Sequence, residues 1–507
     1  MNEGKLCVSV IGDTAEDLFA RLRKAEPIAD VVELRLDKLD PENIRLVFEG
    51  LVSEKQLLLT MRPKEEGGLS PKGLNDRTAF WMEYAIHRLI DHSKIWIDHE
   101  HDMIPQRDFM FWVDQCFVIR SRHYLEGKIA NLDKAYDTVV SKKEVGKIAV
   151  FANDVTATIG IWKMLERANR EAKRMIPIAM GEAGKWTRIL GPAYGAFMTY
   201  ASLDDQNETA PGQITAREMI DVFRVRELNT ETSVYGVVGG KTDYSLSPWM
   251  QNAAFKAAGM NSVFVPLQTN DLEGFFKRMV RPETREINVN FAGFSVTNPH
   301  KVAVMDLLDE VDETASAIGA VNTVKLEDGR LIGYNTDADG FIISLKAAAG
   351  DLGGARVALF GAGGAARACI YALRKEGAEV TVLARNETTG TALAGEFGAR
   401  YEPAAGDRRM ANEFDIVVNA TPLGTLGPRS KFTPLTAPKL EGLRTVYDLV
   451  YNPAETRLMN EAKQAGVPAV GGLGMLIEQG ARQFEIWTGT SAPKDAMRQA
   501  VEDRLKQ

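Results

Sequence analysis

Eight short apolar segments rich in β-branched residues recur through the first half of the chain, and this repetition constrains the fold more than any other feature. The segments lie at residues 6–12, 31–37, 57–62, 94–100, 117–124, 147–154, 175–181 and 195–202. Helix-like stretches such as 79–91 and 156–173 separate most of them. Alternating strands and helices imply right-handed crossovers and a parallel sheet. About eight such units within about 230 residues predict a closed (β/α)8 barrel.

The second half predicts a different α/β architecture with two lobes. The polar stretch 226–233 ends the barrel pattern, and a new glycine-ended strand-like segment begins at 234. Glycines at 350–354 precede another strand-like segment, and helix-like stretches at 475–487 and 494–506 are expected to fold back on the first lobe. We therefore expect a barrel over 1–228, a first lobe over 233–340 joined by 475–507, and a second lobe over 341–474.

Length, charge and cysteine usage exclude several classes of protein. A single core rarely grows beyond about 300 residues, so 507 residues imply more than one domain. No apolar run reaches the roughly 18 residues of a spanning helix, and a net charge of -8 disfavours nucleic-acid and anionic-membrane partners. The scattered Cys7, Cys116 and Cys369 predict neither a disulfide nor a metal site. Without a leader-like start, a cytoplasmic location is expected, and the oligomeric state stays open.

Charged side chains collect toward the carboxyl ends of the predicted barrel strands. They are Glu33, Arg35, Arg62, Asp98 and His123. This end carries the active site in (β/α)8 barrels. A strand-end salt bridge or a cap explains any one of these residues equally well, but such explanations fit the whole group less well. We therefore predict a functional site here.

Lys147 is the candidate nucleophile of this site. By strand alternation it shares one side with Val145, Ala149 and Phe151, so an inward-facing Lys147 has apolar neighbours. Desolvation favours the neutral amine, which can form a Schiff base with a carbonyl group. A solvated lysine at the strand edge is the alternative, because Lys147 lies early in its segment and reaches the barrel mouth only through its long stem.

The remaining polar residues of the first half fit a hydroxylated acid as substrate. His123 can move a proton near neutral pH, and Arg35, Arg62 and Arg188 can hold a carboxylate and hydroxyl groups through forked hydrogen bonds. Glu33, Glu66 and Asp98 can accept hydrogen bonds from His123 or from the substrate. The glycine-containing segments 65–68 and 209–214 can close over a ligand.

The order and spacing of these motifs resemble type I 3-dehydroquinate dehydratases over residues 1–225. The matching residues are Glu33-Leu34-Arg35, Arg62 with Glu66-Gly67-Gly68, Ser121-x-His123, Lys147-Ile148-Ala149, Met180-Gly181, Arg188 and Ala210-Pro211-Gly212-Gln213. The resemblance implies that Lys147 forms an imine with the C3 carbonyl and that His123 removes a C2 proton, with Glu33 and Asp98 as its partners. It also implies substrate contacts for Met180, Arg188, Gln213 and Thr209, which stands where the family usually has serine.

A glycine-rich turn in the second half predicts a nucleotide site. Gly361, Ala362, Gly363, Gly364 and Ala365 follow a strand-like segment and begin a helix-like one. Such glycines let a pyrophosphate approach the backbone at a helix N-terminus. The next strand-like segment ends at Arg385, which suits the 2′-phosphate of NADP better than an acidic residue does. A solvated loop arginine is the alternative.

The first lobe of the second half carries a separate group of polar motifs. Ser245 and Ser247 stand before a helix-like segment, where two hydroxyl groups can bind a carboxylate. Thr297 and Lys301 follow a strand-like segment, and Asn322 and Asp337 add an amide and a carboxylate. Taken singly, each is better explained as a cap, a turn residue or an exposed lysine.

As a set these motifs resemble shikimate dehydrogenase over residues 234–507. Further matches are Asn419-Ala420-Thr421-Pro422, Tyr447–Pro453 and Gly474-Met475-Leu476 with Gln479. The resemblance implies that Lys301 and Asp337 assist proton transfer beside the carbonyl oxygen. It assigns Ser245, Ser247, Thr297, Asn322, Tyr451 and Gln479 to the substrate, and Asn419, Thr421 and Gly472 to the cofactor. Residues 241–244 depart from the proline and histidine common in the family.

Together the two resemblances imply Schiff-base dehydration of 3-dehydroquinate followed by NADPH-dependent reduction of the product to shikimate. No metal is required, because an imine and a nicotinamide supply the chemistry. One alternative is a Schiff-base aldolase barrel fused to a quinate or other hydroxy-acid dehydrogenase. Another is an inactive metabolite sensor, against which the joint presence of Lys147, His123, Lys301 and Asp337 counts.

Overall fold

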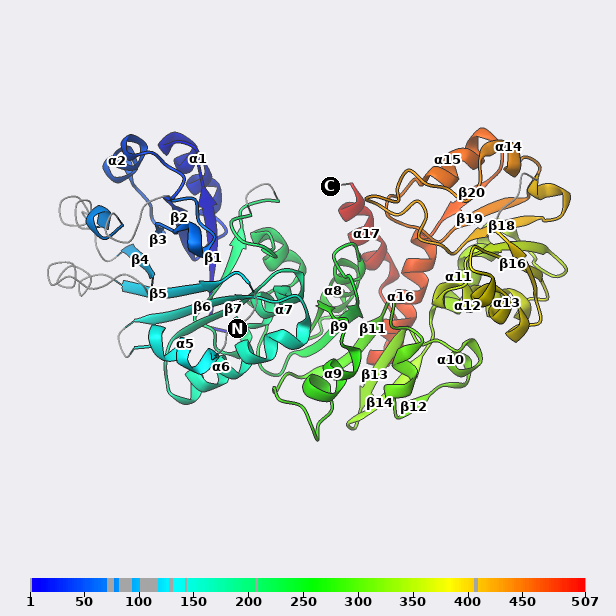
Figure 1. The fold of residues 1–507 in the computed structure, drawn as a ribbon, viewed down its shortest axis with the longest axis horizontal. Coiled ribbons are helices and arrows are strands. Elements are labelled where there is room, and N and C mark those ends of the chain that lie inside the picture. The colour runs from blue at the N-terminus through cyan, green and yellow to red at the C-terminus, as the bar shows by residue number, and fades with distance from the viewer. Residues whose placement is uncertain are drawn as a thin grey trace. The chain divides into compact units, whose positions relative to one another are not determined.

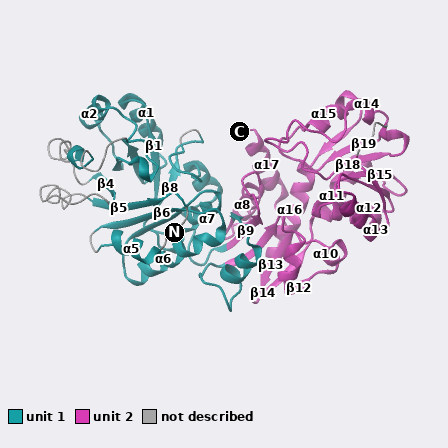
Figure 2. Ribbon diagram, in the orientation of Figure 1, with its two compact units in different colours: residues 1–233, 265–290 teal, residues 234–264, 291–507 magenta. Residues whose placement is uncertain are grey.

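The computed structural model describes residues 2–70, 77–81, 94–100, 117–126, 131–141, 144–205, 208–404 and 409–506. Most of the predicted helix at 79–91, and Cys116, lie outside these residues. The described chain divides into two compact units (Figure 2), residues 1–233 with 265–290, and residues 234–264 with 291–507. The two lobes expected for the second half therefore share one unit. Residues 265–290 group with the barrel, where Asp154 accepts a hydrogen bond of 3.0 Å from the Thr269 hydroxyl.

Eight parallel strands form the barrel of the first unit in the order β7-β6-β5-β4-β3-β2-β1-β8 (Figure 1). The predicted strands are confirmed to within a few residues at each end. They are β1 Lys5–Ile11, β2 Val31–Arg35, β3 Gln56–Thr60, β4 Ile95–Glu100, β5 Phe117–Tyr124, β6 Val145–Phe151, β7 Met175–Met180 and β8 Met198–Ser202. The described helices around them are α1 Ala15–Ala25, α2 Pro41–Gly50, α5 Leu132–Val139, α6 Ile159–Arg170 and α7 Lys185–Leu190.

The seam between β7 and β8 closes the barrel less completely than the other strand pairs do. A backbone hydrogen bond of 2.9 Å joins the Phe197 amide, just before β8, to the Met175 carbonyl at the start of β7. The other neighbouring strands pair through continuous parallel ladders, such as β1 with β8 and β6 with β7. The sheet is thus a nearly closed barrel.

Alternation along β6 separates the barrel interior from the outer layer. Val145 and Ala149 belong to a buried cluster that strands β1, β2 and β3 share. Ile148 and Val150 pack outward, in a cluster with Tyr136 of α5 and with α6. A strand covered on both faces requires this nearly continuous apolar sequence. Since Lys147 alternates with the outward pair, it points into the barrel.

The register of β5 and β6 explains how Lys147 reaches the site from its early position. Ser121 pairs with Lys147, and His123 pairs with Ala149. His123 therefore lies one inward-facing position closer to the carboxyl end than Lys147 does. The long lysine side chain spans this step.

The second unit contains two six-stranded sheets. The first has the order β10-β9-β11-β13-β14-β12 and mixes parallel and antiparallel pairs. Its strands are β9 Ser233–Gly239, β10 Ser262–Gln268, β11 Phe291–Val296, β12 Glu310–Val311, β13 Thr323–Glu327 and β14 Arg330–Tyr334, and the helices beside it are α8 Ser247–Ala257 and α10 Glu313–Ile318. Helix α9 Leu272–Phe275 lies within the residues that group with the barrel. Part of β10 belongs to the residues that group with the barrel.

The other sheet has the strand order of a dinucleotide-binding fold. Its parallel order β17-β16-β15-β18-β19-β20 corresponds to 3-2-1-4-5-6 along the chain. The strands are β15 Arg356–Phe360, β16 Glu379–Ala384, β17 Arg400–Pro403, β18 Ile416–Asn419, β19 Thr445–Asp448 and β20 Ala469–Gly471. The helices are α11 Asp337–Ala349, α12 Gly364–Lys375, α13 Glu387–Glu396, α14 Ala437–Leu440 and α15 Arg457–Gln464.

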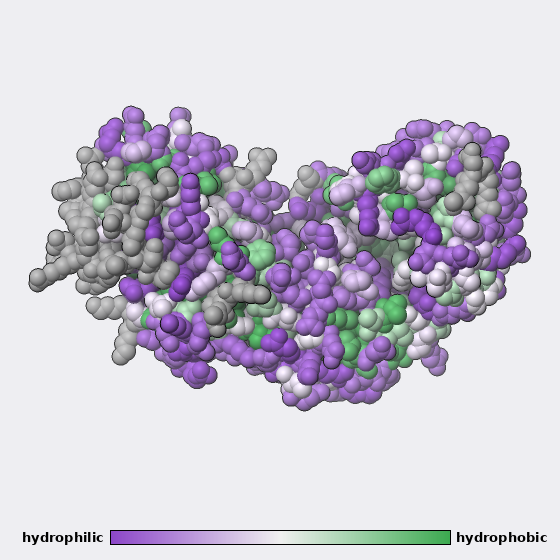
Figure 3. All heavy atoms as spheres, viewed as in Figure 1, coloured by the Kyte–Doolittle hydropathy of each residue, from purple (hydrophilic) through white to green (hydrophobic). Residues whose placement is uncertain are grey.

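Two C-terminal helices return to the first sheet, as the sequence predicts. They are α16 Leu473–Thr488 and α17 Lys494–Leu505. Met497 and Val501 of α17 are buried in one cluster with Met250 of α8 and Phe484 of α16. Among the described helices, none combines the length and the hydropathy that a membrane crossing requires. On the face seen in Figure 3, hydrophobic residues form scattered areas among hydrophilic ones.

Close contact between α11 and α16 depends on Gly340. A Cβ atom at this position would lie 2.8 Å from the backbone nitrogen of Gln479 and 2.9 Å from the backbone carbonyl oxygen of Met475. Backbone atoms cannot move aside as a flexible side chain can. The glycine thus fixes the spacing of two helices that carry the predicted site residues Asp337 and Gln479.

We predict that Gly340→Ala lowers the free energy of unfolding of the second unit by about 1–3 kcal/mol, because the added methyl group forces the two helices apart. Gly395→Ala is the matched control, since a Cβ there meets nothing within 4 Å in helix α13. The control should be neutral or stabilising by up to about 1 kcal/mol. Calorimetric unfolding of both variants measures the difference, and equal transitions would contradict the prediction.

Candidate active sites

One cavity lies where the carboxyl ends of the barrel strands meet. The residues predicted for the first half line it with one exception, and additional walls come from Ser9, Ala149, Ile178 and Tyr200. The predicted residues in its walls are Glu33, Arg35, Arg62, Glu66, His123, Lys147, Met180, Arg188, Thr209 and Gln213. The exception is Asp98, which is fully buried behind the cavity wall.

Lys147 lies inside this cavity, and the alternative of a solvated lysine is wrong. Its residue exposure is 4%. The Nζ atom lies 3.3 Å from Oδ2 of Asp98 and 4.0 Å from the ring centroid of Tyr200. The amine is thus held between one carboxylate and one aromatic face.

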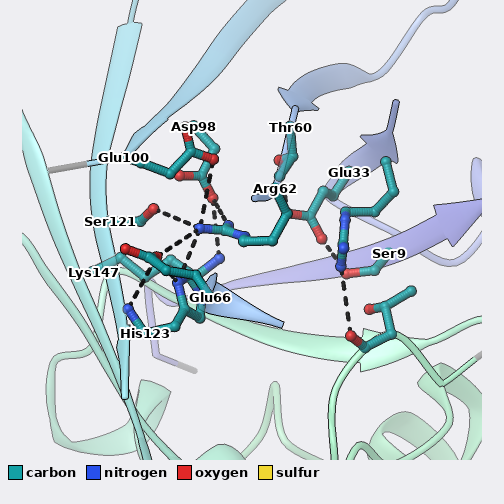
Figure 4. Close-up of polar contacts among 12 residues, drawn as sticks. Ser9, Glu33, Thr60, Arg62, Glu66, Asp98, Glu100, Ser121, His123 and Lys147 are labelled. Carbon is teal, nitrogen blue, oxygen red and sulfur yellow. Dashed lines mark hydrogen bonds and ion pairs between the residues drawn. The ribbon is translucent and has the colours of Figure 1, made fainter. Parts of the chain in front are cut away.

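Arg62 joins the charged groups of the site into one network (Figure 4). Its Nη2 donates to Oδ2 of Asp98 at 2.5 Å, and its Nη1 donates to the Ser121 hydroxyl at 2.9 Å. Burial opposes the charge on Arg62, but Asp98 and Glu100 raise its pKa above the ordinary value. Although burial favours a neutral carboxyl group, Arg62 and Lys147 hold the pKa of Asp98 well below its usual range. Asp98 is therefore a buried anion shared by two cations.

Of the three acceptors offered for His123, Glu66 is the one that contacts it, and the Glu33 and Asp98 partners that the resemblance implied are wrong. The Nδ1 atom of His123 lies 2.9 Å from Oε2 of Glu66 and 2.9 Å from Nη1 of Arg62. The Glu66 carboxylate only accepts hydrogen bonds and the Arg62 guanidinium only donates them, so Nδ1 bonds to one of them at a time. A proton on Nδ1 pairs with Glu66 and leaves a lone pair on Nε2, whereas a lone pair on Nδ1 accepts from Arg62. Burial, with the Arg62 charge beside it, lowers the pKa of His123 to about 4. Its imidazole is neutral near pH 7 and can accept a proton.

Glu33 belongs to a separate hydrogen-bonded group. It accepts from the Ser9 hydroxyl at 2.5 Å and from the Thr60 hydroxyl at 2.8 Å. Ser9 and Thr60 lie on the strands that flank β2, which explains why Glu33 points toward them and not toward His123. Its carboxylate still lines the cavity.

Besides Arg62, two further buried arginines face the cavity, and they have different partners. Arg35 forms a forked pair with Asp37, at 2.7 and 2.8 Å, which neutralises it. Arg188 is 2% exposed, and no carboxylate lies within ion-pair distance of it among the described residues. Burial lowers the pKa of Arg188 to about 10, so the guanidinium stays charged near neutral pH. Arg188 is therefore a buried cation without an ion-paired carboxylate among the described residues, although the charge of Glu208 acts on it from beyond ion-pair distance.

Gln213 and Thr209 form another part of the cavity wall. The Gln213 side-chain oxygen accepts from the Thr209 amide at 2.8 Å and lies 3.3 Å from the Thr209 hydroxyl. The Thr209 carbonyl lies 3.5 Å from Nη1 of Arg35. The hydroxyl at position 209 thus lines the same cavity as Lys147.

In the second unit, Lys301 and Asp337 form the predicted pair. The Lys301 ammonium contacts Oδ2 of Asp337 directly. Oδ1 of Asp337 accepts from the Asn322 side-chain amide at 2.8 Å, and Gln479 lies 3.5 Å from the same amide. The strands and helices around them thus bring four of the predicted residues into one hydrogen-bonded group.

The other residues predicted for this site lie on other elements of the second unit. The Ser247 amide donates to the Ser245 hydroxyl at 3.3 Å at the start of α8, a helix that packs against α16. Thr297 comes directly after β11. Burial raises the pKa of the Tyr451 phenol above its ordinary value. The structure gives no direct contact between these four residues and the Lys301–Asp337 pair.

The glycine-rich turn has the features that a pyrophosphate requires. Gly361 has a φ of +116°, and a Cβ at Gly363 would meet nothing within 4 Å. The first turn of α12 has no side-chain cap, so its backbone N–H groups remain for a ligand. A Cβ at Gly364 would lie 3.3 Å from Cβ of Lys301. The turn is therefore adjacent to the Lys301–Asp337 pair.

Asn419 supports the loop beside this turn. It accepts from the Thr421 hydroxyl at 2.6 Å and donates to Asp448 at 2.9 Å. Burial raises the pKa of Asp448 to about 6. Gly472 begins α16, and Arg385 is exposed just after β16. The predicted cofactor residues thus border the carboxyl edge of one sheet, where such folds bind ligands.

Within the described part of the chain, no group of three or more His, Cys, Asp or Glu side chains is arranged to hold a metal ion. Residues that the sequence analysis did not single out include Ser9, Asp37, Tyr200 and Asp448. The inward alternation of β1 was a usable signal for Ser9, because Ser9 lies two residues beyond the inward-facing Cys7.

Comparisons with family models divide the chain in two. Residues 6–230 match the model of type I 3-dehydroquinase. Residues 237–324 match the substrate-binding domain of shikimate dehydrogenase, 344–426 match shikimate/quinate 5-dehydrogenase, and 472–502 match the C-terminal domain of shikimate 5′-dehydrogenase. The first match contains the barrel cavity, the second contains Lys301 and Asn322, and the third contains the glycine-rich turn, while Asp337 falls between the second and the third.

Similar proteins cover the same two regions. A chloroplastic bifunctional 3-dehydroquinate dehydratase/shikimate dehydrogenase of Arabidopsis thaliana is 31% identical over 97% of this chain and 83% of its own. An NADP⁺-dependent shikimate dehydrogenase of Methanopyrus kandleri is 41% identical over 55% of this chain and 98% of its own. A crystal structure of a shikimate dehydrogenase with NADP⁺ matches 55% of this chain and 98% of its own, with 37% identity and a TM-score of 0.50.

We predict that His123 remains neutral between about pH 4 and 6.5, the interval between its lowered pKa and the ordinary value. The unfolded chain binds a proton there and the folded chain does not, so this residue lowers stability as the pH falls through the interval. NMR titration of labelled histidines measures the pKa, and His123→Gln assigns the resonance. A midpoint near 6.5 would contradict the prediction.

Proposed function

Since the chain belongs to the family of bifunctional 3-dehydroquinate dehydratase/shikimate dehydrogenases, we propose that its two units carry out two successive reactions on one hydroxylated ring acid. The barrel dehydrates 3-dehydroquinate to 3-dehydroshikimate. The second unit reduces this product to shikimate with NADPH. The aldolase alternative is set aside, because the barrel matches the type I 3-dehydroquinase model over residues 6–230.

The observation that carries the dehydratase assignment is the coexistence of a buried amine and an unpaired buried arginine in one cavity. Lys147 supplies the amine, and Arg188 has no carboxylate partner among the described residues. A buried charge without a partner is costly, and an anionic ligand removes that cost. A substrate with a carboxylate at one end and a ketone at the other satisfies both groups.

In the proposed dehydration, Lys147 attacks the C3 carbonyl of the substrate. A C–N bond forms, the carbonyl oxygen leaves as water, and a protonated imine remains. His123 accepts the C2 proton, which its neutral imidazole permits, and the electron pair moves into the imine. The resulting enamine expels the hydroxyl group of the neighbouring ring carbon as water. Hydrolysis of the imine then releases the product and Lys147.

The surrounding residues position these two groups. Asp98 orients Lys147 and Arg62, and Glu66 fixes the His123 ring. Arg188 binds the substrate carboxylate, while Arg35, Met180, Thr209 and Gln213 contact the ring. Glu33, which the sequence analysis placed with His123, instead accepts hydrogen bonds from substrate hydroxyl groups, together with Ser9.

In the proposed reduction, Lys301 donates a proton to the carbonyl oxygen of 3-dehydroshikimate. Asp337 holds Lys301 and is itself held by Asn322. Ser245 and Ser247 bind the carboxylate, and Thr297, Tyr451 and Gln479 bind ring hydroxyl groups. NADPH, when bound, supplies the hydride.

The residues of the second unit fit NADPH. The open Gly361–Gly364 turn and the uncapped start of α12 accommodate its pyrophosphate. Asn419, Thr421 and Gly472 hold the loops on the nicotinamide side, and Arg385 binds the 2′-phosphate. Cys7 and Cys369 are buried free thiols, which favours a reducing compartment such as the cytoplasm.

We predict that Lys147→Met reduces dehydratase activity by at least about 10³-fold, because no other amine in the cavity wall replaces it. Borohydride reduction in the presence of 3-dehydroquinate should fix the substrate mass to the peptide containing Lys147 in the parent protein. Reduction of added 3-dehydroshikimate by the same variant is the control and should be unchanged. Undiminished dehydration would refute the barrel mechanism.

We predict that Lys301→Ala lowers kcat for 3-dehydroshikimate reduction by about 10²-fold or more, with a much smaller effect on the Kd of NADPH, because the lost group acts on the carbonyl oxygen. Stopped-flow measurement of nicotinamide oxidation and fluorescence titration of NADPH separate the two effects. Dehydration of 3-dehydroquinate by this variant provides the internal control. Full reductase turnover would exclude the assigned role.

A further inference from the structure

Tyr200 places an aromatic face against the amine that the dehydration mechanism uses. The Lys147 Nζ lies 4.0 Å from its ring centroid, within the range of a cation–π contact. Tyr200 lies in β8, where it pairs with Cys7 of β1, and its ring belongs to the inner cluster with Ala149 and Ile178. Packing thus fixes the ring in the wall of the cavity that Lys147 also lines.

Burial makes this contact strong. Lys147 and Tyr200 are 4% and 3% exposed, so little water competes with the ring for the cation. A cation–π contact contributes more when it is desolvated than at an exposed site. Burial, with the Glu33 carboxylate nearby, also raises the pKa of the Tyr200 phenol well above its ordinary value, which keeps the ring neutral.

The hydroxyl group of Tyr200 does not explain the position of the ring. Its oxygen is buried and has no hydrogen-bond partner among the described residues. A buried hydroxyl group without a partner is unfavourable, so packing of the ring must hold the side chain there. The feature of Tyr200 that matters at Lys147 is therefore its π face.

The positive charge on Lys147 is only partly compensated by carboxylates, so the π face of Tyr200 can add to its stabilisation. Asp98 is the carboxylate in contact with Nζ, at 3.3 Å, and it also binds Arg62 at a shorter distance of 2.5 Å. One anion shared between two buried cations compensates each of them only in part. The negative face of an aromatic ring supplies additional stabilisation without adding a titratable carboxylate beside the nucleophile.

We propose that the π face of Tyr200 stabilises the positive charge that develops on Nζ of Lys147 when the substrate imine forms, which makes Tyr200 a catalytic residue. The proposal rests on the proposed function of Lys147. The amine first adds to the carbonyl carbon to give a neutral carbinolamine. Loss of its hydroxyl group as water, with one proton added, then forms the C=N bond and leaves the positive charge on nitrogen. Tyr200 stabilises this charged product over the neutral carbinolamine.

The experiment changes the electron density of the ring at position 200 while keeping the shape of the ring nearly constant. Tyr200→Phe is the reference variant, and monofluoro-, difluoro- and trifluorophenylalanine at the same position withdraw electron density from the π face stepwise. Rapid mixing with 3-dehydroquinate, followed by borohydride quenching, gives the rate at which the adduct on Lys147 forms. We expect Tyr200→Phe to retain nearly the parent rate, and each added fluorine to lower the rate, to about tenfold in total.

A matched control exists in the same unit. Tyr136 also lies under a cation, with Cζ of Arg167 at 4.2 Å from its ring centroid, but it belongs to the outer layer and does not line the cavity. The same fluorinated series at position 136 should leave the adduct rate unchanged. Unaltered reduction of added 3-dehydroshikimate shows that the second unit is intact, and an unchanged unfolding transition shows that the substituted barrel is folded.

The outcomes separate this proposal from the function on which it rests. Equal adduct rates across the fluorinated series at position 200, with the adduct still mapped to Lys147, would overturn the role of the ring and leave the imine mechanism intact. Absence of any adduct in the parent protein would refute the imine mechanism itself. Tyr200→Leu provides a further measurement, and a rate equal to that of Tyr200→Phe would also overturn the proposal.

Discussion

The barrel site depends on one carboxylate that two cations share. Asp98 contacts both Arg62 and Lys147, is fully buried, and has no place in the cavity wall. Because Arg62 also reaches Ser121 and lies beside His123, displacement of Asp98 would alter the surroundings of Lys147 and His123 together. Asp98 thus sets the arrangement of the site, although it does not line the cavity itself.

The second unit uses a carboxylate in a similar way but on different elements. Asp337 binds Lys301 through one oxygen and Asn322 through the other, so neither oxygen is free to rotate toward a competing partner. Its helix, α11, is held against α16 at the close spacing that Gly340 permits. Packing of two helices therefore fixes Asp337, which holds the Lys301 ammonium.

Sequence patterns predicted the strands and the cavity residues well because both follow from simple periodicity. The inward position of Lys147 follows from alternation with outward Ile148 and Val150, and His123 and Arg62 follow from the rule that barrel sites form at carboxyl ends. Three acceptors were offered for His123, and the choice of Glu66 over Glu33 and Asp98 did not follow from periodicity, since Glu66 comes from the loop after β3. Tyr200 was overlooked because an aromatic residue in an apolar strand looks like ordinary core.

Each site is built wholly from one of the two compact units. The residues lining the barrel cavity lie between 9 and 213, and the Lys301–Asp337 group and the glycine-rich turn belong to residues 291–507. Lesions in the two halves should consequently complement each other in trans. A cell that carries one copy damaged at Lys147 and another damaged at Lys301 would still make both catalysts, so a genetic locus of this kind can behave as two genes.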